Sequence, residues 1–80
     1  MNSKEITLAG LPIGVEAIVT NLAGDNRITQ RLMEMGVVPG VRVRILKTAP
    51  AGDPLEIHVR GYHLAIRKNE AELIGVSYEC

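Results

Sequence analysis

The chain has 80 residues, of which 46% are hydrophobic, and this length allows one domain with a real core but not a second. Because Phe and Trp are absent and Tyr occurs only twice, that core must be aliphatic. Nine basic residues balance nine acidic ones, which argues against non-specific binding to DNA or anionic lipid, since such binding relies on excess positive charge.

The sequence predicts a soluble, cytoplasmic protein. Its N-terminal residues lack the apolar run of a signal peptide, and no segment approaches the ~20 apolar residues of a membrane-spanning helix. The single cysteine, Cys80, cannot form an intramolecular disulfide, which fits a reducing compartment.

The first part of the chain predicts an apolar lead-in, a turn and then a strand. Leu8 and Leu11 precede Gly14, where we expect the turn. Residues 14–22, GVEAIVTNL, then alternate apolar and polar side chains, as a half-buried strand does. Ile18 interrupts the alternation, so both faces of this strand should be at least partly covered.

A short helix is predicted next. Asp25 or Asn26 can cap its N-terminus by accepting hydrogen bonds from free backbone N–H groups. Gly36 is placed to end the helix in the left-handed conformation, and Pro39-Gly40 predicts a tight turn beyond it. Residues spaced i, i+4 and i+7 form one apolar stripe: Ile28, Leu32 and Met35.

Short strands complete the predicted order of elements. VRVRI (41–45) and LEIHVRG (55–61, ended by Gly61) alternate cleanly, and TAPAGDP between them has turn composition, so we expect an antiparallel pair. Further strands are predicted at 63–67 and 74–78, with Asn69 capping a single helical turn between them. The side chains expected to face outward are Arg42, Arg44, Glu56, His58 and Arg60.

Strands this short, each half-buried, need closure to avoid exposed edges. The sequence therefore predicts a mainly β fold: a small, partly open barrel with one short α-helix between the first strand and the rest. Residues 1–80 should form this single domain.

The sequence offers no catalytic or nucleotide-binding motif. GLPIG and AGDP contain glycine but lack the GxxxxGK[ST] pattern that cradles phosphates, and both have turn composition. Ser77 and Thr29 have no neighbour that suggests activation as a nucleophile. We expect neither an enzyme nor a bound cofactor.

His58, His63 and Cys80 are weak candidates for metal ligands. The two histidines are five residues apart, but Gly61 lies between them and their faces need not agree. A structural zinc site commonly uses four ligands in CxxC or HxxxH pairs, which this chain lacks. Ordinary surface histidines are the favoured interpretation, and no metal site is assigned.

The basic strand residues are candidates for a nucleic-acid surface. Arg42, Arg44, Arg60, Arg67 and Lys68 could gather on one sheet face, but stacking on bases needs aromatic side chains that are nearly absent here. A solvated face with interspersed acids is favoured, and no nucleic-acid partner is expected.

The helix offers the more informative surface for a protein partner. Met33 lies roughly 120° from the centre of the apolar stripe, so the barrel should bury it only partly. A semi-exposed Met beside Arg31 and Glu34 is typical of an adaptable contact surface. Packing of Met33 under the 21–25 loop is the alternative. We take Arg31, Met33 and Glu34 as the candidate contact residues.

Several motifs, in order along nearly the whole chain, resemble those of one family. The lead-in L-x-x-L-x-x-G is matched by Leu8, Leu11 and Gly14. The pattern R-L-x-x-[LM]-G-[LIVM]-x-P-G is matched by Arg31, Leu32, Met35, Gly36, Val37, Pro39 and Gly40. P-x-G-D-P is matched by Pro50, Gly52, Asp53 and Pro54. The pattern [VI]-R-G-x-x-[LIV]-[AS]-[LI]-R is matched by Val59, Arg60, Gly61, Leu64, Ala65, Ile66 and Arg67.

By these motifs the chain resembles the ferrous iron transport protein A (FeoA) family of small SH3-like proteins. Met35 and Ile66 stand where leucine is common, and both keep volume and apolarity. The resemblance implies an accessory role in bacterial Fe(II) uptake, with the cytoplasmic part of the FeoB transporter as partner, without direct membrane insertion. It carries over no catalytic or metal-binding residue.

A related SH3-like domain ends many iron- or manganese-dependent repressors. The alternative function is therefore a metal-sensing domain that binds Fe(II) or another divalent metal. A stand-alone repressor is disfavoured, because the chain has no winged-helix or dimerisation region. Weak self-association is left open.

Overall fold

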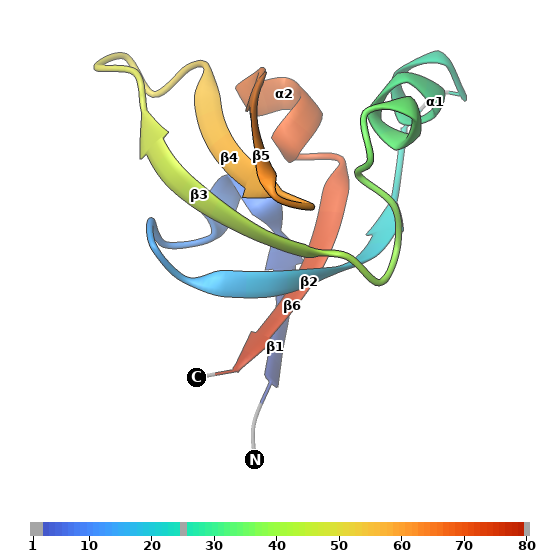
Figure 1. The fold of residues 1–80 in the computed structure, drawn as a ribbon, viewed down its shortest axis with the longest axis horizontal. Coiled ribbons are helices and arrows are strands. Elements are labelled where there is room, and N and C mark those ends of the chain that lie inside the picture. Colours follow the sequence, from blue (N-terminus) through green and yellow to red (C-terminus); the bar gives the residue numbers. More distant parts are fainter. Residues whose placement is uncertain (1–2, 25, 80) are drawn as a thin grey trace.

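The computed structural model describes residues 3–24 and 26–79 as a mainly β domain with two short α-helices (Figure 1). No helix in these ranges is long and apolar enough to cross a membrane. The elements in chain order are β1 (Ser3–Thr7), the 3₁₀-helix η1 (Leu8–Gly10), β2 (Glu16–Leu22), α1 (Asn26–Glu34), β3 (Arg42–Thr48), β4 (Leu55–Val59), β5 (Tyr62–Ile66), α2 (Lys68–Ala71) and β6 (Ile74–Glu79).

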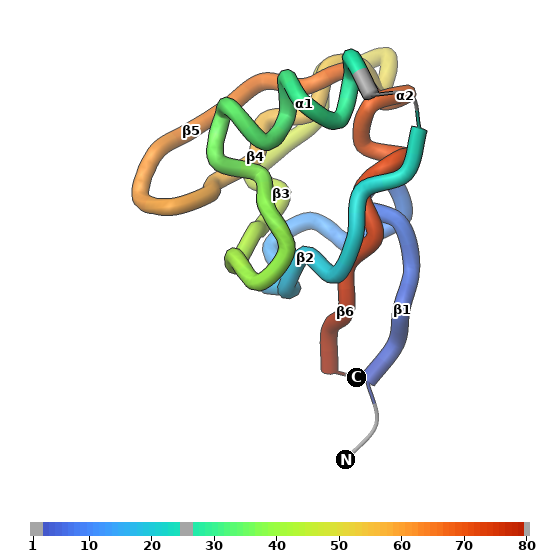
Figure 2. Tube along the Cα trace, turned by 90° about the vertical axis from the view of Figure 1, so that its right-hand side faces the viewer, coloured from blue at the N-terminus to red at the C-terminus, as the bar shows by residue number. Residues whose placement is uncertain are grey.

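The strands form one antiparallel sheet in the order β1-β6-β2-β3-β4-β5. The sheet curls around the core, but its edge strands β1 and β5 do not pair, so the predicted partly open barrel is confirmed. Register shifts in β2 and β3 mark irregularities that help a sheet to bend. β1 and β6 run side by side toward the two termini, at the far end of the molecule from α1 (Figure 2).

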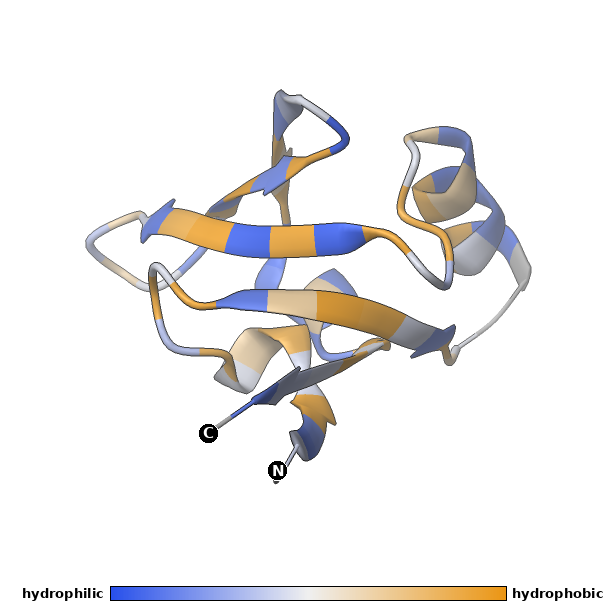
Figure 3. Ribbon diagram, turned by 60° about the horizontal axis from the view of Figure 1, so that its bottom comes forward, coloured by the Kyte–Doolittle hydropathy of each residue, from blue (hydrophilic) through white to orange (hydrophobic). Residues whose placement is uncertain are grey.

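Alternation of side chains along the strands builds an aliphatic core, as predicted. In β3, Val43 and Ile45 are buried while Arg42 is exposed and Arg44 is half-buried. Figure 3 shows the matching alternation of hydrophobic and hydrophilic residues along the strands. The buried apolar side chains are Leu8, Leu11, Ala17, Val19, Leu32, Val37, Val43, Ile45, Leu55, Ile57, Val59, Ile66, Ala71, Ile74 and Val76.

The N-terminal strand β1 was not predicted, so α1 follows the second strand rather than the first. Its sequence, SKEIT, has one apolar residue and little intrinsic preference to pair. Pairing with β6 decides its conformation, with Ile6 opposite Val76. The expected apolar lead-in is therefore a strand followed by η1, which buries Leu8.

The second helix begins two residues earlier than predicted, because Arg67 rather than Asn69 occupies the N-cap position. Glu70 Oε1 accepts a hydrogen bond of 2.9 Å from the Arg67 backbone N–H. Asp53 Oδ1 accepts another, of 3.1 Å, from the Lys68 N–H. Two N–H groups at the start of α2 are thus satisfied by carboxylates, one from its own turn and one from the β3–β4 loop.

Candidate partner-binding site

Helix α1 is held on the barrel by Leu32, which is completely buried. The helix ends at Glu34, and Gly36 follows it with a φ of +96°, the left-handed conformation that was predicted for this glycine. Val37 N–H donates to Leu32 C=O at 3.0 Å, and Gly36 N–H donates to Met33 C=O at 3.0 Å. These two bonds form a Schellman motif, and the buried Val37 supplies its apolar contact. The expected Asp25 cap lies outside the described residues.

The end of α1 is also tied to the β4–β5 hairpin. Tyr62 Oη donates a hydrogen bond to the Met35 C=O, one of the carbonyls that the helix leaves free. Beyond the helix, Gly40 N–H donates to Val19 C=O at 2.8 Å. This bond fixes the turn through which the chain enters β3. The C-terminal end of the helix is therefore bonded to β5, and the turn that follows it is bonded to β2.

The outward face of α1 carries an exposed methionine over a shallow pocket. Met33 is 47% exposed, one of the few large apolar side chains in the described ranges that faces solvent. The pocket has a volume of about 590 Å³, and its lining residues are Thr29, Gln30, Met33, Glu34 and Val38. The position predicted for Met33, away from the core, agrees with its exposure; that this face binds a partner remains a prediction.

Arg31 is directed elsewhere. Its Nη2 lies 3.5 Å from Glu70 Oε2, so it links α1 to α2 and does not line the pocket. Sequence reasoning missed Thr29 and Gln30, although their i, i+4 spacing from Met33 and Glu34 places them on the same face. Val38 follows the helix, and only the turn at Gly36 brings it to the pocket.

The two histidines lie on the same outer face of the sheet. His58 in β4 is directly opposite His63 in β5, with ring centroids 5.6 Å apart and ring planes at 75°. Gly61 between them does not separate their faces, because it belongs to the hairpin turn that brings them together. Within the described ranges no group of three His, Cys, Asp or Glu residues could hold a metal ion, and Cys80 lies outside those ranges.

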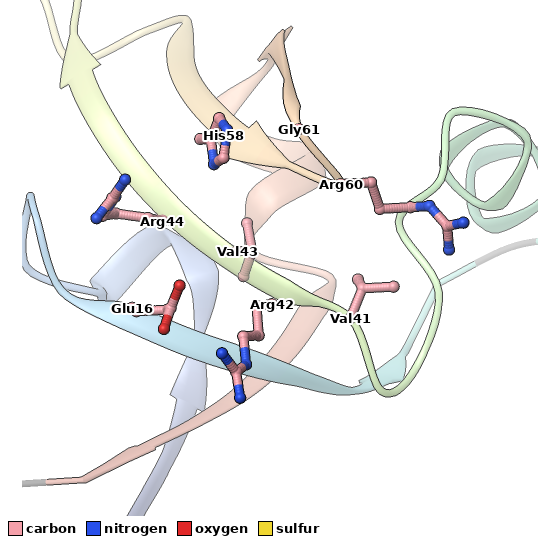
Figure 4. Close-up of a pocket in the computed structure, with 8 residues that line it drawn as sticks. All are labelled: Glu16, Val41, Arg42, Val43, Arg44, His58, Arg60 and Gly61. Carbon is pink, nitrogen blue, oxygen red and sulfur yellow. The ribbon is translucent and has the colours of Figure 1, made fainter.

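A second pocket, of about 380 Å³, lies on the outer face of β2, β3 and β4 (Figure 4). Arg42, Arg44 and Arg60 line it together with Glu16 and His58, whereas Arg67 and Lys68 of the predicted basic group do not. In Figure 4 the three guanidinium groups point in different directions. They do not converge on one position, so the pocket is not a site for a single anion.

Comparison with known proteins places these features in a family. The family model described as "FeoA domain" matches residues 6–78. A fusion of Fe(2+) transport protein A and Fe(2+) transporter FeoB from Porphyromonas gingivalis is 29% identical over 69 residues, which are 86% of this chain. This chain spans 8% of the length of that relative.

Two solved structures are similar over most of the chain. FeoA from Chlorobium tepidum is 39% identical, with a TM-score of 0.86 over 94% of this chain and 71% of the other. FeoA from Stenotrophomonas maltophilia, solved with zinc and described as a prokaryotic SH3 domain protein, is 35% identical, with a TM-score of 0.74 over 89% of this chain and 88% of the other. The fold is therefore SH3-like, as expected, and the chain belongs to the FeoA domain family.

Proposed function

We propose that this chain is a cytoplasmic accessory protein of bacterial ferrous iron uptake, which binds the cytoplasmic part of an FeoB-type transporter and catalyses no reaction. The observation that carries the proposal is the Porphyromonas gingivalis relative, in which a similar domain and an FeoB transporter form one chain. Covalent linkage raises the effective concentration of two modules that act together. Here the same association would form between separate chains.

The α1 pocket supports this role by its composition. The Met33 thioether side chain is flexible and polarizable, so it can adapt to an apolar side chain of the transporter. Thr29, Gln30 and Glu34 provide a polar rim, as protein interfaces commonly do. The Schellman motif and the Tyr62 bond hold the helix, so the surface is ordered before a partner binds.

The experiment is binding of the purified chain to the purified cytoplasmic part of FeoB from the same organism. Met33→Asp should weaken binding about tenfold, because it replaces an apolar contact by a charge. Ile13→Asp is the matched control, since Ile13 is also exposed, at 58%, but lies in the turn before β2. Equal losses for the two variants, or none for either, would refute α1 as the contact surface.

Charge reversal tests the polar part of the surface. Glu34→Lys alone is a better variant than reversal of both Arg31 and Glu34, because reversing Arg31 would also break its ion pair with Glu70.

A strain that lacks this protein should lose Fe(II) uptake, and normal uptake there would refute the proposed function itself.

A further inference from the structure

We propose that His58 and His63 form a two-imidazole site for a divalent first-row transition metal ion. The proposal goes beyond the proposed function, because it concerns another face of the molecule and needs no transporter. The two pockets share no residue, and His58 lines the one on the sheet. The chain contains two histidines in all, so any site with two imidazoles must be this pair.

The hairpin positions the two rings for a common ligand. A two-residue turn, Arg60-Gly61, joins β4 to β5, and both of its residues have positive φ, at 52° and 86°. Such turns match the twist of the flanking strands and fix their register. His58 therefore cannot slip relative to His63 without moving the whole hairpin, whose other face buries Ile57 and Val59.

The spacing of the rings suits a metal ion. Two imidazoles on one tetrahedral ion, with metal–nitrogen bonds of about 2.0–2.1 Å, have ring centroids roughly 5 Å apart. The observed separation of the ring centroids is 5.6 Å, which is close to the spacing that two imidazoles on one ion require. The two protein ligands leave coordination positions for water or for a side chain of a partner.

The ligand type selects the class of metal. Neutral imidazole suits Zn²⁺, Ni²⁺, Cu²⁺ and Fe²⁺, whereas Mg²⁺ and Ca²⁺ prefer oxygen ligands. In the usual order of affinities Fe²⁺ binds more weakly than Ni²⁺ or Cu²⁺. We therefore expect the site to take Ni²⁺ and Zn²⁺ in a direct titration more tightly than it takes Fe²⁺.

The positive charge of Arg44 should lower the affinity of the site for a metal ion. Arg44 is the cross-strand partner of His58 on the other side, and Glu16 is in turn the partner of Arg44. Arg44 Nε is buried and has no hydrogen-bond partner among the described residues. Its positive charge next to His58 repels a cation, so removing it should strengthen metal binding about threefold.

The test is a calorimetric titration of the full chain with Ni²⁺ and with Zn²⁺, in a Cys80→Ser background that removes the thiol. His63→Gln and His58→Gln should each weaken binding about tenfold or more. Arg44→Gln should strengthen it about threefold. Ala65→Gln is the matched control, because exposed Ala65 lies two residues from His63 in β5 and the change alters no charge, so it should leave the affinity unchanged.

A second readout locates the ion. Ni²⁺ should broaden the amide NMR signals of residues around His58 and His63, and Mg²⁺ should not. Unfolding temperatures of the histidine variants should match that of the parent, because both rings face outward. The proposal is overturned if His63→Gln binds like the parent, if Arg44→Gln weakens binding, or if the broadening centres elsewhere. Each outcome is independent of binding to FeoB.

Discussion

Replacing Gly36 by alanine tests whether the end of α1 is locked by the β4–β5 hairpin. A Cβ at this position would lie 2.5 Å from Tyr62 Oη and 3.2 Å from Arg60 Cδ. At Gly40, an added Cβ would have no atom within 4 Å. The two glycines have nearly the same φ, +96° and +98°, so Gly40→Ala is a matched control for the backbone alone.

The magnitude follows from this comparison. An alanine in the left-handed conformation costs about 1–2 kcal/mol at either position. At Gly36 the Tyr62 hydroxyl must also move and give up its hydrogen bond to the Met35 carbonyl, which adds about 1 kcal/mol. Gly36→Ala should therefore lower the free energy of unfolding by about 2–3 kcal/mol, roughly 1 kcal/mol more than Gly40→Ala.

Urea unfolding followed by far-UV circular dichroism measures both losses. Tyr62→Phe completes a double-mutant cycle with Gly36→Ala, because it removes the hydroxyl that the new methyl group would displace. The double variant should lose about 1 kcal/mol less than the sum of the single losses. If Gly36→Ala and Gly40→Ala lower the free energy of unfolding by the same amount within about 0.3 kcal/mol, the hairpin does not stabilise the helix end.

Two further pairs of variants each compare a buried residue with an exposed one. Leu32→Ala should lower the free energy of unfolding by about 3 kcal/mol, because it leaves a cavity under α1, whereas the exposed Met33→Ala should change it by less than about 0.5 kcal/mol in the same urea titration. Glu70→Ala should cost about 1–3 kcal/mol, since it leaves the Arg67 N–H without its acceptor. Arg31→Ala should cost under about 1 kcal/mol, because the Arg31 side chain is 67% exposed; thermal unfolding that ranks these two the other way would contradict this assignment.

Much of the fold was readable because local patterns and tertiary burial agree. Val43 and Ile45 alternate with arginines, and the structure buries the apolar residues and leaves Arg42 exposed and Arg44 half-buried. Gly36 follows the helix at the position where a positive φ is common, and its φ is positive. The conformation at these positions depends on residues nearby in the chain, so it can be predicted from the sequence alone.

The candidate site was only partly readable. The helical period placed Met33 away from the core, and it is 47% exposed. The same period could not show that Arg31 reaches Glu70, because the two residues come together only when α2 docks beside α1. It also could not bring Val38 to the pocket, which depends on the direction that the chain takes after Gly36.

The sequence by itself determined the aliphatic core, the order of most strands, and the turns and helix end that glycine and proline mark. It could do so because periodicity and turn chemistry are local. Only the tertiary structure decided that residues 3–7 form a strand, since SKEIT acquires its partner from the other end of the chain. It also decided that His58 faces His63, because strand register depends on the turn and on the whole buried face. Contacts between distant segments are set by packing, and a linear pattern does not record them.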